Sequence, residues 1–278
     1  MKFSLIMATL GRKDEVYVFL NSLVSQTYKY FELIIVDQNP DERIYEIYNK
    51  YKNSIDITYI KSDRKGLSCN RNIGLAKCSG DIVAFPDDDC EYNHDTLERV
   101  VSFFENNADY LFYTCNTMDK NSNGAIFKAK STDTDVSVFN FMSVSISITI
   151  FVKSTAIGSF RFDEQLGLGT FFGSGEESDL LLFLLKQKNN GRYHANNYIY
   201  HPAGTETPER AFLYGKGFGA VYKKAIVHYG FILLLPVFLL RLLKGIINII
   251  IHKDKNIRSA SFRGRLMGFL QYSSNKKS

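Results

Sequence analysis

Hydrophobic and polar positions along the first 110 residues alternate between two periods. Short runs with no polar face predict buried strands, and runs with an apolar residue every three or four positions predict helices. Strands are expected at 3–9, 31–36, 55–60 and 82–85. Helices are expected at 12–27, 41–52, 68–77 with Ser68 as its cap, and 96–106. Four strand–helix repeats predict an α/β fold with a mostly parallel central sheet and helices on both faces.

Beyond residue 110 the alternation weakens. Strands are expected at 110–116 and 144–152, with a polar and irregular stretch between them at 118–136. A helix with an almost continuous Leu and Phe face is expected at 179–188. Gly191 is expected to end it, and a strand then runs to Tyr200.

The region 225–251 differs from the rest of the chain. An apolar run over 229–240 is interrupted by Arg241 and Lys244 and resumes at 245–251. A spanning helix needs about 20 apolar residues, and a central arginine is costly in a bilayer. A helical element in the membrane interface fits better, while the alternative is a buried helix hairpin packed on the domain.

Charge divides the chain in the same place. Residues 1–214 hold 22 Lys and Arg against 28 Asp and Glu, whereas residues 215–278 hold 12 against 1. A uniformly basic chain would suggest nucleic acid, but a basic tail on an acidic body indicates that the tail alone meets a polyanion. We expect an anionic membrane surface and no nucleic acid, with these tail residues facing the headgroups: Lys253, Lys255, Arg258, Arg263 and Arg265.

Composition excludes several protein classes. The chain has 278 residues, of which 45% are hydrophobic and 23% charged, so disorder, collagen and disulfide scaffolds are excluded. Its four cysteines have no C-x-x-C spacing, which is typical of a reduced, cytosolic chain. The apolar stretch after Lys2 is too short for a secretory signal, so we expect no signal peptide.

Polar side chains stand where three of the expected strands end. Thr9 follows the first strand, Asp37 the second, and Asp87, Asp88 and Asp89 the fourth. Ligands bind at the carboxyl ends of parallel strands in such sheets. Carboxylates collected at one edge repel one another, and a divalent cation such as Mn²⁺ or Mg²⁺ would offset that repulsion. The alternative is a solvated acidic turn.

A second acidic cluster lies in the glycine-rich stretch 173–179. Carboxylates in a first helical turn favour the helix dipole, and Asp179 fits that capping role. Glu176 and Glu177 exceed what capping needs, and one of them could serve as a general base.

Five stretches in order, at 3–9, 31–37, 66–74, 85–89 and 175–177, resemble the family 2 glycosyltransferases of GT-A fold. The resemblance covers about residues 2–205. The region beyond it is similar to membrane-associated members that build capsule and O-antigen repeats. The resemblance implies a GT-A catalytic domain at 1–220, with a nucleotide-binding half at about 1–117 and an acceptor half at about 118–220. A basic, apolar helical tail would follow at 221–278.

The resemblance also implies roles for the donor site. Thr9, Asp37 and Arg71 would line the nucleobase pocket. Asp88 would hold the ribose, with Asp87 supporting the edge of the site.

For the reaction, the resemblance makes Asp89 a ligand of Mn²⁺ or Mg²⁺, with His201 as a further metal or diphosphate contact. Glu177 would be the general base, with Glu176 as the alternative, and the anomeric configuration would invert. Arg210, near Tyr214 and Lys216, could close over the diphosphate, or these residues could form a solvated helix face.

These expectations combine into a metal-dependent, inverting hexosyltransferase. It would move a sugar from a nucleotide-sugar to a polyprenyl-linked saccharide at the cytoplasmic face of the plasma membrane, in surface polysaccharide synthesis. UDP is the expected nucleotide, and dTDP-linked deoxysugars and GDP-sugars are the open alternatives. A sugar nucleotidyltransferase would carry a glycine-rich phosphate loop after the first strand, where 10–13 holds one glycine. A phosphatase with an aspartyl nucleophile would place its acidic motif on an early strand. A non-catalytic, membrane-bound scaffold of the same fold is the other alternative.

Overall fold

The computed structural model describes residues 1–122, 124–125 and 130–273, and these form two compact units. The first unit comprises 1–65, 69–161 and 187–203. The second comprises 66–68, 162–186 and the described residues from 204 onward. The domain limits expected at 117 and 220 stay predictions.

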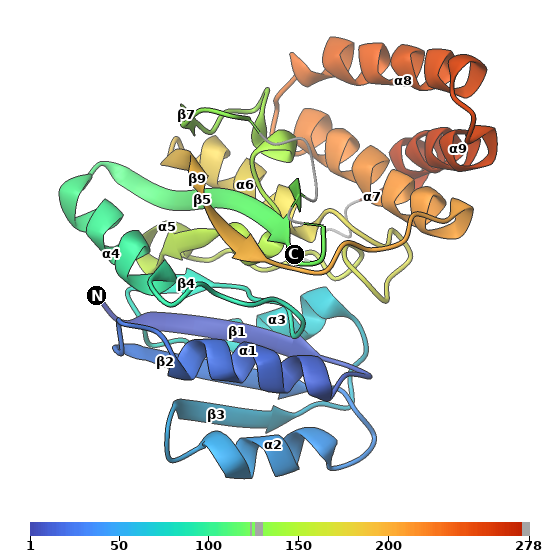
Figure 1. Cartoon of the computed structure of the whole chain (residues 1–278). Helices are drawn as coiled ribbons and strands as arrows, with labels where there is room; N and C mark the ends of the chain where they lie inside the picture. Colours follow the sequence, from blue (N-terminus) through green and yellow to red (C-terminus); the bar gives the residue numbers. More distant parts are fainter. Residues whose placement is uncertain (123, 126–129, 274–278) are drawn as a thin grey trace. The chain divides into compact units, whose positions relative to one another are not determined.

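The first unit is built on a nine-stranded sheet in the order β3-β2-β1-β4-β8-β5-β9-β7, with β6 paired to β5 (Figure 1). The strands are β1 (Phe3–Thr9), β2 (Phe31–Asp37), β3 (Asp56–Lys61), β4 (Ile82–Ala84), β5 (Tyr110–Asp119), β6 (Gly124–Ala125), β7 (Thr134–Asp135), β8 (Phe151–Lys153) and β9 (Asn190–Tyr200). The four strands from β3 to β4 are parallel, as expected. β8 runs antiparallel to β4 and β5, while β5 and β9 are again parallel.

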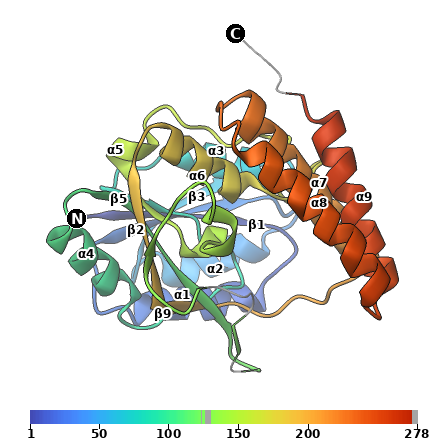
Figure 2. The same cartoon turned by 90° about the horizontal axis from the view of Figure 1, so that it is seen from above.

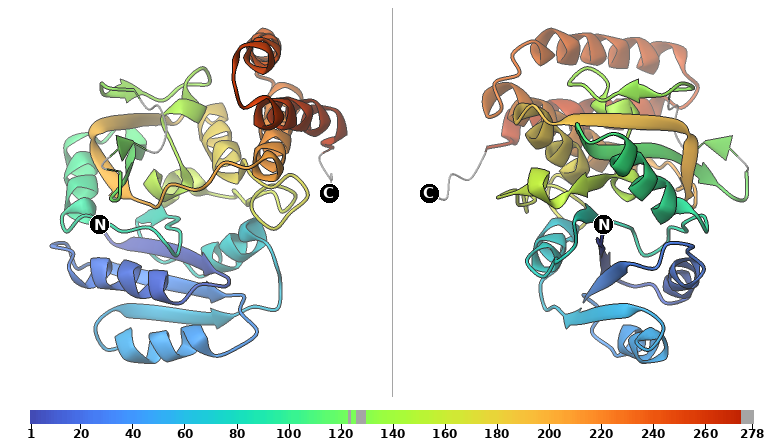
Figure 3. Two further views of the ribbon diagram at one scale, coloured as in Figure 1. Left: turned by 45° about the vertical axis from the view of Figure 1, so that its right-hand side comes forward. Right: turned by 90° about the vertical axis from the view of Figure 1, so that its left-hand side faces the viewer.

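Helices cover both faces of this sheet, which confirms the expected layers. α1 (Asp14–Val24), α2 (Arg43–Tyr51) and α4 (Thr96–Asn106) lie on one side, with α3 (Leu67–Leu75) and α5 (Ser154–Ile157) on the other (Figures 2 and 3). Phe3, Leu5 and Met7 share one core cluster with the buried faces of the first three helices. On the opposite face, a Cβ at Gly74 of α3 would lie 2.4 Å from Ile6, so only glycine permits this approach. β1 and β2 are therefore buried on both sides, as their lack of a polar face predicted.

Three local predictions were wrong. The strand expected over 144–152 is confirmed only at β8; before it lie two 3₁₀ turns, η1 (Phe141–Ser143) and η2 (Ser147–Thr149). The Thr149 hydroxyl donates to the Ile146 carbonyl at 2.8 Å, a local hydrogen bond that competes with strand pairing. Ser68 lies inside α3, and its hydroxyl donates to the Leu166 carbonyl at 2.6 Å.

Gly191 does not end the preceding helix. α6 (Glu176–Lys186) begins and ends earlier than expected, and Gly191 lies within β9. A Cβ at Gly191 would meet the Phe112 ring at 1.9 Å. The glycine is therefore needed for the close approach of β9 to a buried aromatic ring of β5.

The second unit contains α6, α7 (Pro208–Val227), α8 (Leu234–Ile251) and α9 (Lys255–Gln271). α7 and α9 pack side by side through glycines. A Cβ at Gly219 would lie 2.1 Å from the Arg265 carbonyl oxygen, and one at Gly268 would lie 1.9 Å from that of Lys216. The two backbones thus touch where side chains would separate an ordinary helix pair.

α8 is the least buried of these helices. The Phe238 ring stacks on Phe269 of α9 at 4.5 Å between centroids. Over its 18 residues α8 has a mean hydropathy of 2.1 and is 17% buried. Of the described helices it alone is long and apolar enough to cross a membrane. The alternative of a buried hairpin over 225–251 therefore does not describe α8.

Candidate active site

The sheet brings the strand-end residues of the first unit to one edge. Thr9 and Asp37 are paired in register as the last residues of β1 and β2. β4 pairs with the other side of β1, and the run 87–89 follows it after the buried Phe85. This part of the predicted site is therefore assembled by the parallel half of the sheet.

Asp87 and Asp89 meet His201, which directly follows β9. The ligand atoms of the three side chains all lie within 4.8 Å of one another. His201 Nε2 is 3.2 Å from Asp89 Oδ1 and 3.9 Å from Asp87 Oδ2. His201 Nδ1 lies 2.8 Å from the Pro202 carbonyl oxygen, an acceptor, so Nδ1 carries a proton and Nε2 is the ring's ligand atom. Two carboxylates and an imidazole at this spacing fit a divalent cation.

These contacts also shift the pKa values of Asp89 and His201. Burial alone would raise the pKa of Asp89, but His201 and Arg12 outweigh burial and lower it. Burial would lower the pKa of His201, and the contact with Asp89 raises it instead.

Arg12, which the sequence analysis did not assign to the site, reaches two of the three acids. Its Nη1 donates to Asp88 Oδ1, and its Nη2 lies 2.6 Å from Asp89 Oδ2. Burial raises the pKa of Asp88, and Arg12 opposes that rise. The one signal for Arg12 in the sequence was its place in the loop directly after β1.

Arg71 is fully buried and pairs with the remaining acid. Its Nη2 donates to Asp87 Oδ1 at 2.8 Å, and its guanidinium lies 5.9 Å from the centre of the Phe85 ring. Each acid of the run 87–89 therefore has a cationic partner. The nucleobase contact expected of Arg71 stays a prediction.

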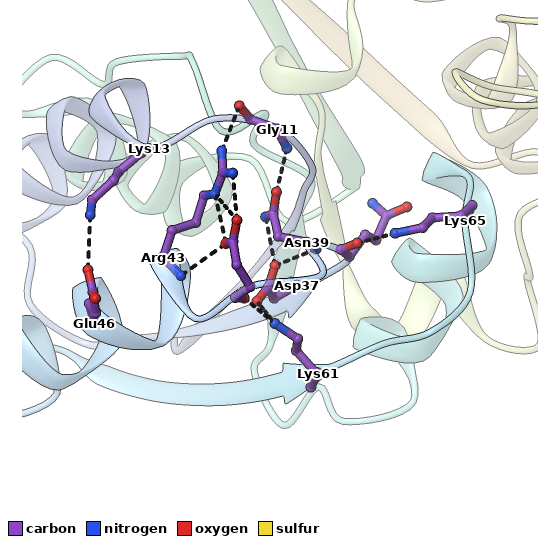
Figure 4. A network of polar contacts seen from close by, with 10 residues as sticks. Gly11, Lys13, Asp37, Asn39, Arg43, Glu46, Lys61 and Lys65 are labelled. Carbon is purple, nitrogen blue, oxygen red and sulfur yellow. Dashed lines mark hydrogen bonds and ion pairs between the residues drawn. The ribbon is translucent and has the colours of Figure 1, made fainter.

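Asp37 is fully buried and accepts four hydrogen bonds, of which Figure 4 shows those from Asn39 and Lys61. Oδ1 accepts from the backbone and side-chain amides of Asn39 at 2.8 and 2.7 Å. Oδ2 accepts from the Tyr59 hydroxyl at 2.8 Å and from Lys61 Nζ at 3.0 Å. Burial and the contact with Asp37 raise the pKa of Tyr59, which stays protonated as a donor. Asn39, Tyr59 and Lys61 were missed from the sequence, although β3, which carries two of them, was expected beside Asp37.

The second unit holds the other predicted residues. Gly175, at φ 96°, leads into α6, whose first residue, Glu176, is buried. Glu177 is half-buried and accepts from the Ser178 hydroxyl at 3.0 Å. Asp179 lies in the first turn of α6, as expected. It also pairs with Lys224 Nζ of α7 at 2.8 Å, because a carboxylate this deeply buried needs a cation.

Arg210 lies in the first turn of α7. Its Nη2 donates to the Tyr214 hydroxyl at 3.0 Å. Lys216 is directed elsewhere, with Nζ 3.9 Å from the centre of the Phe171 ring. The structure thus brings Thr9 beside Asp37 and joins Asp87, Asp88, Asp89, Arg71 and His201 at the sheet edge. Glu176, Glu177 and Arg210 belong to the second unit.

Comparisons with known proteins identify the family of the chain. Residues 4–167 match the family model described as glycosyl transferase family 2. Over 116 residues the chain is 30% identical to the poly(ribitol-phosphate) beta-N-acetylglucosaminyltransferase TarS of Staphylococcus aureus, covering 40% of this chain and 20% of TarS. Over 111 residues it is 32% identical to WfaP of Escherichia coli, a UDP-Glc:alpha-D-GlcNAc-diphosphoundecaprenol beta-1,3-glucosyltransferase, covering 40% of this chain and 44% of WfaP. The chain thus matches less than half the length of either relative.

Solved structures show the same fold. S. aureus TarS 1–349 in complex with UDP-GlcNAc aligns with a TM-score of 0.66 at 19% identity, covering 99% of this chain and 74% of that one. The mannosyltransferase PcManGT from Pyrobaculum calidifontis, in complex with GDP-Man and Mn²⁺, aligns with a TM-score of 0.70 at 12% identity, covering 96% and 86%. These likenesses confirm the expected GT-A type α/β fold.

Proposed function

Since the chain belongs to glycosyltransferase family 2, we propose that it transfers one sugar from a UDP-sugar donor to a lipid-linked saccharide acceptor. The observation that carries the proposal is the group of Asp87, Asp89 and His201 at the edge of the sheet where Asp37 also lies. A UDP donor is supported by the UDP-GlcNAc bound to TarS and by the substrate named for WfaP. A lipid-linked acceptor is supported by the diphosphoundecaprenol in the name of WfaP.

Asp87, Asp89 and His201 would hold a Mn²⁺ or Mg²⁺ ion. When bound, such an ion stabilises the negative charge that develops on a departing nucleoside diphosphate. Arg12 and Arg71 already neutralise part of the charge of the acidic run, which reduces the repulsion among its carboxylates.

Asp37 would hold the nucleobase, with Thr9 and Arg71 beside it and Asp88 on the ribose. Because a carboxylate has about four acceptor positions, the four donors on Asp37 leave no position free for a base N–H. Lys61 is the donor we expect to give way, since its side chain is 35% exposed and its Nζ also donates to the Asp41 carbonyl.

Glu177 would take the proton from the acceptor hydroxyl, and Arg210 would contact the diphosphate. Glu177 suits the role of base better than Glu176, because Glu176 is 5% exposed whereas Glu177 is half-buried. A base opposite the leaving group gives a single displacement, so the anomeric configuration inverts.

α8 would lie in the headgroup region of an anionic membrane, at the cytoplasmic face of the plasma membrane. Its outward residues are large and apolar; Leu239, Leu240, Leu243, Ile250 and Ile251 are 54% to 70% exposed. Arg241 is directed inward, with its guanidinium 5.7 Å from the centre of the Phe218 ring of α7. The arginine therefore lies on the protein side of the helix, whereas Lys244 is exposed and would extend its ammonium group to the headgroups. α9 adds basic residues next to this surface.

Calorimetric binding of UDP, dTDP and GDP, each with and without Mn²⁺, tests the donor site. We expect one nucleotide to bind, to need Mn²⁺, and to lose that binding in Asp89→Ala. Asp95→Ala is the matched control, because Asp95 is also paired with an arginine, Arg99, at 2.6 Å, but lies outside the site. If none of the three nucleotides shows metal-dependent binding, the donor site is wrong and the non-catalytic scaffold becomes the better interpretation.

A further inference from the structure

The carboxylate oxygens of Asp87 and Asp89 are divided between two kinds of partner. Asp89 Oδ2 lies 2.6 Å from Arg12 Nη2, and Asp87 Oδ1 lies 2.8 Å from Arg71 Nη2. The other oxygen of each carboxylate faces His201 Nε2, at 3.2 Å for Asp89 Oδ1 and 3.9 Å for Asp87 Oδ2. One oxygen of each acid is thus held by an arginine, and the other is turned toward a common point.

The oxygen of Asp89 that is turned inward is unsatisfied. Asp89 Oδ1 is buried, and the whole side chain is 5% exposed; its near polar neighbour, His201 Nε2 at 3.2 Å, forms no hydrogen bond with it, and none comes from the other residues that the structure describes. A buried carboxylate oxygen without a donor is costly, and such atoms are rare in folded proteins. The unsatisfied atom points to a ligand that binds it.

Arg12 is itself held in place by the backbone that carries it. Gly11 adopts a φ of 84°, which favours glycine, and its N–H donates to Asn39 Oδ1 at 2.6 Å (Figure 4). Arg43 Nη1 donates to the Gly11 carbonyl at 3.3 Å. The loop after β1 is therefore fixed by residues that follow β2, and the arginine reaches the acids from a defined position.

We propose that Arg12 is a positioning residue for the divalent cation: it holds Asp89 through Oδ2 so that Oδ1 alone is presented to the ion, as Arg71 does for Asp87. The inference rests on the metal site of the proposed function. The planar guanidinium fork places two N–H groups in fixed directions, and here they engage the adjacent carboxylates of Asp88 and Asp89. A lysine has the same charge but offers a single ammonium without that fork.

A role of Arg12 through its charge alone and a role through its geometry predict opposite effects of Arg12 substitutions on Mn²⁺ affinity, so the two can be distinguished by experiment. If Arg12 were a cation that merely competes with the ion, its removal would strengthen Mn²⁺ binding and Arg12→Lys would change little. If Arg12 positions Asp89, both variants weaken binding, by about 10- to 100-fold as for other residues that orient metal ligands.

The experiment measures Mn²⁺ affinity from the electron paramagnetic resonance signal of the free ion, with and without saturating UDP. The proteins are wild type, Arg12→Lys, Arg12→Ala and the control Arg99→Lys, whose arginine pairs with Asp95 away from the site. Thermal unfolding checks that each variant folds, and Arg12→Gln replaces any that does not. We expect weaker Mn²⁺ binding in the Arg12 variants and wild-type binding in Arg99→Lys.

Two other outcomes have separate meanings. Wild-type affinity in Arg12→Lys together with tighter binding in Arg12→Ala overturns the positioning role and leaves the metal site intact. No Mn²⁺ binding by the wild type, with or without UDP, overturns both the positioning role and the metal part of the proposed function.

Discussion

Each carboxylate of the run 87–89 in the first unit lies against a cation, whereas Glu177 in the second unit has no cation within ion-pair distance among the described residues. The difference matches the two tasks proposed for these acids. A carboxylate that must stay ionised benefits from a nearby cation, which lowers its proton affinity. A general base must accept a proton, and a cation beside it would oppose that step.

The largest expected effect comes from removing the base. Glu177→Gln should lower kcat by about 10²- to 10⁴-fold, because general base catalysis contributes that much. Binding of UDP and Mn²⁺ should stay unchanged, since the acids of the first unit are intact. Release of UDP in the presence of acceptor measures kcat. Glu176→Gln is the comparison: a larger loss there than in Glu177→Gln would make Glu176 the base.

Asp179 belongs to the same acidic stretch, 173–179, as Glu177, but it is paired with a cation, and we expect that pair to affect stability. Lys224 Nζ lies 2.8 Å from both Asp163 and Asp179, and its side chain is 14% exposed. Lys224→Met leaves the buried Asp179 and the half-buried Asp163 without their cation and should lower the free energy of unfolding by about 3–5 kcal/mol. Urea unfolding measures the change. Lys223→Met, at a half-buried neighbour that donates to the Leu270 carbonyl and not to a carboxylate, should have a smaller effect, and equal losses in the two variants would contradict a special role for the paired lysine.

Membrane binding should depend on the exposed face of α8. Leu239→Gln and Leu243→Gln should each weaken binding to vesicles with anionic lipid by about tenfold, because burying one leucine side chain in the membrane contributes roughly 1.5 kcal/mol to binding. Sedimentation with the vesicles measures the bound fraction. Leu270→Gln, at a 72% exposed leucine of α9, is the matched control. Unchanged binding in both α8 variants would place the membrane contact elsewhere.

The smallest effect concerns a paired acid at the opposite end of β2. Burial alone would raise the pKa of Glu32, but hydrogen bonds from Lys2, Ser4 and Ser79 lower it. Glu32 therefore stabilises the fold above its unfolded pKa of about 4.3, and this contribution is lost as pH falls through its lowered folded pKa.

Urea unfolding between pH 6 and pH 3 tests this contribution. Glu32→Gln should remove about 1 kcal/mol of the acid-dependent loss of stability. Asp56→Asn, at an exposed acid 3.7 Å from the same lysine, should follow the wild type. An identical pH dependence in Glu32→Gln and wild type would show that Glu32 is not the group responsible.

The sheet was readable from the sequence because β1 and β2 are buried on both faces, and a strand of that kind has no polar face. The strand expected over 144–152 failed for a different reason: its apolar residues alternate, but Ser and Thr side chains bond to their own backbone. The hydrophobic periodicity of a sequence does not reveal such competition between local side-chain hydrogen bonds and strand pairing.

The sequence indicated a site residue where two conditions coincide: a residue type suited to binding a cation or a base, and a position at the end of an expected strand. Asp37 and Asp89 met both conditions, whereas Arg12 met only the second, because a single arginine in a loop gives no sign of its partner. Two pairs of glycines spaced four residues apart, Gly215 with Gly219 and Gly264 with Gly268, were the sequence signal for the α7–α9 packing. The search for helix periodicity considers only the apolar and polar positions and therefore passes over this spacing.

The contact of α9 with the rest of its unit determines the order in which the chain can fold. Tyr272 donates to Asp163 Oδ2 at 2.6 Å, across 109 residues of sequence. Every strand of the sheet precedes residue 201, so the first unit can assemble on the ribosome while the later helices are still being made. The second unit cannot be completed until α9 has been synthesised, and by then the apolar α8 has already emerged. The helix proposed to bind lipid is therefore presented to a nearby membrane before the helix that packs against it is available.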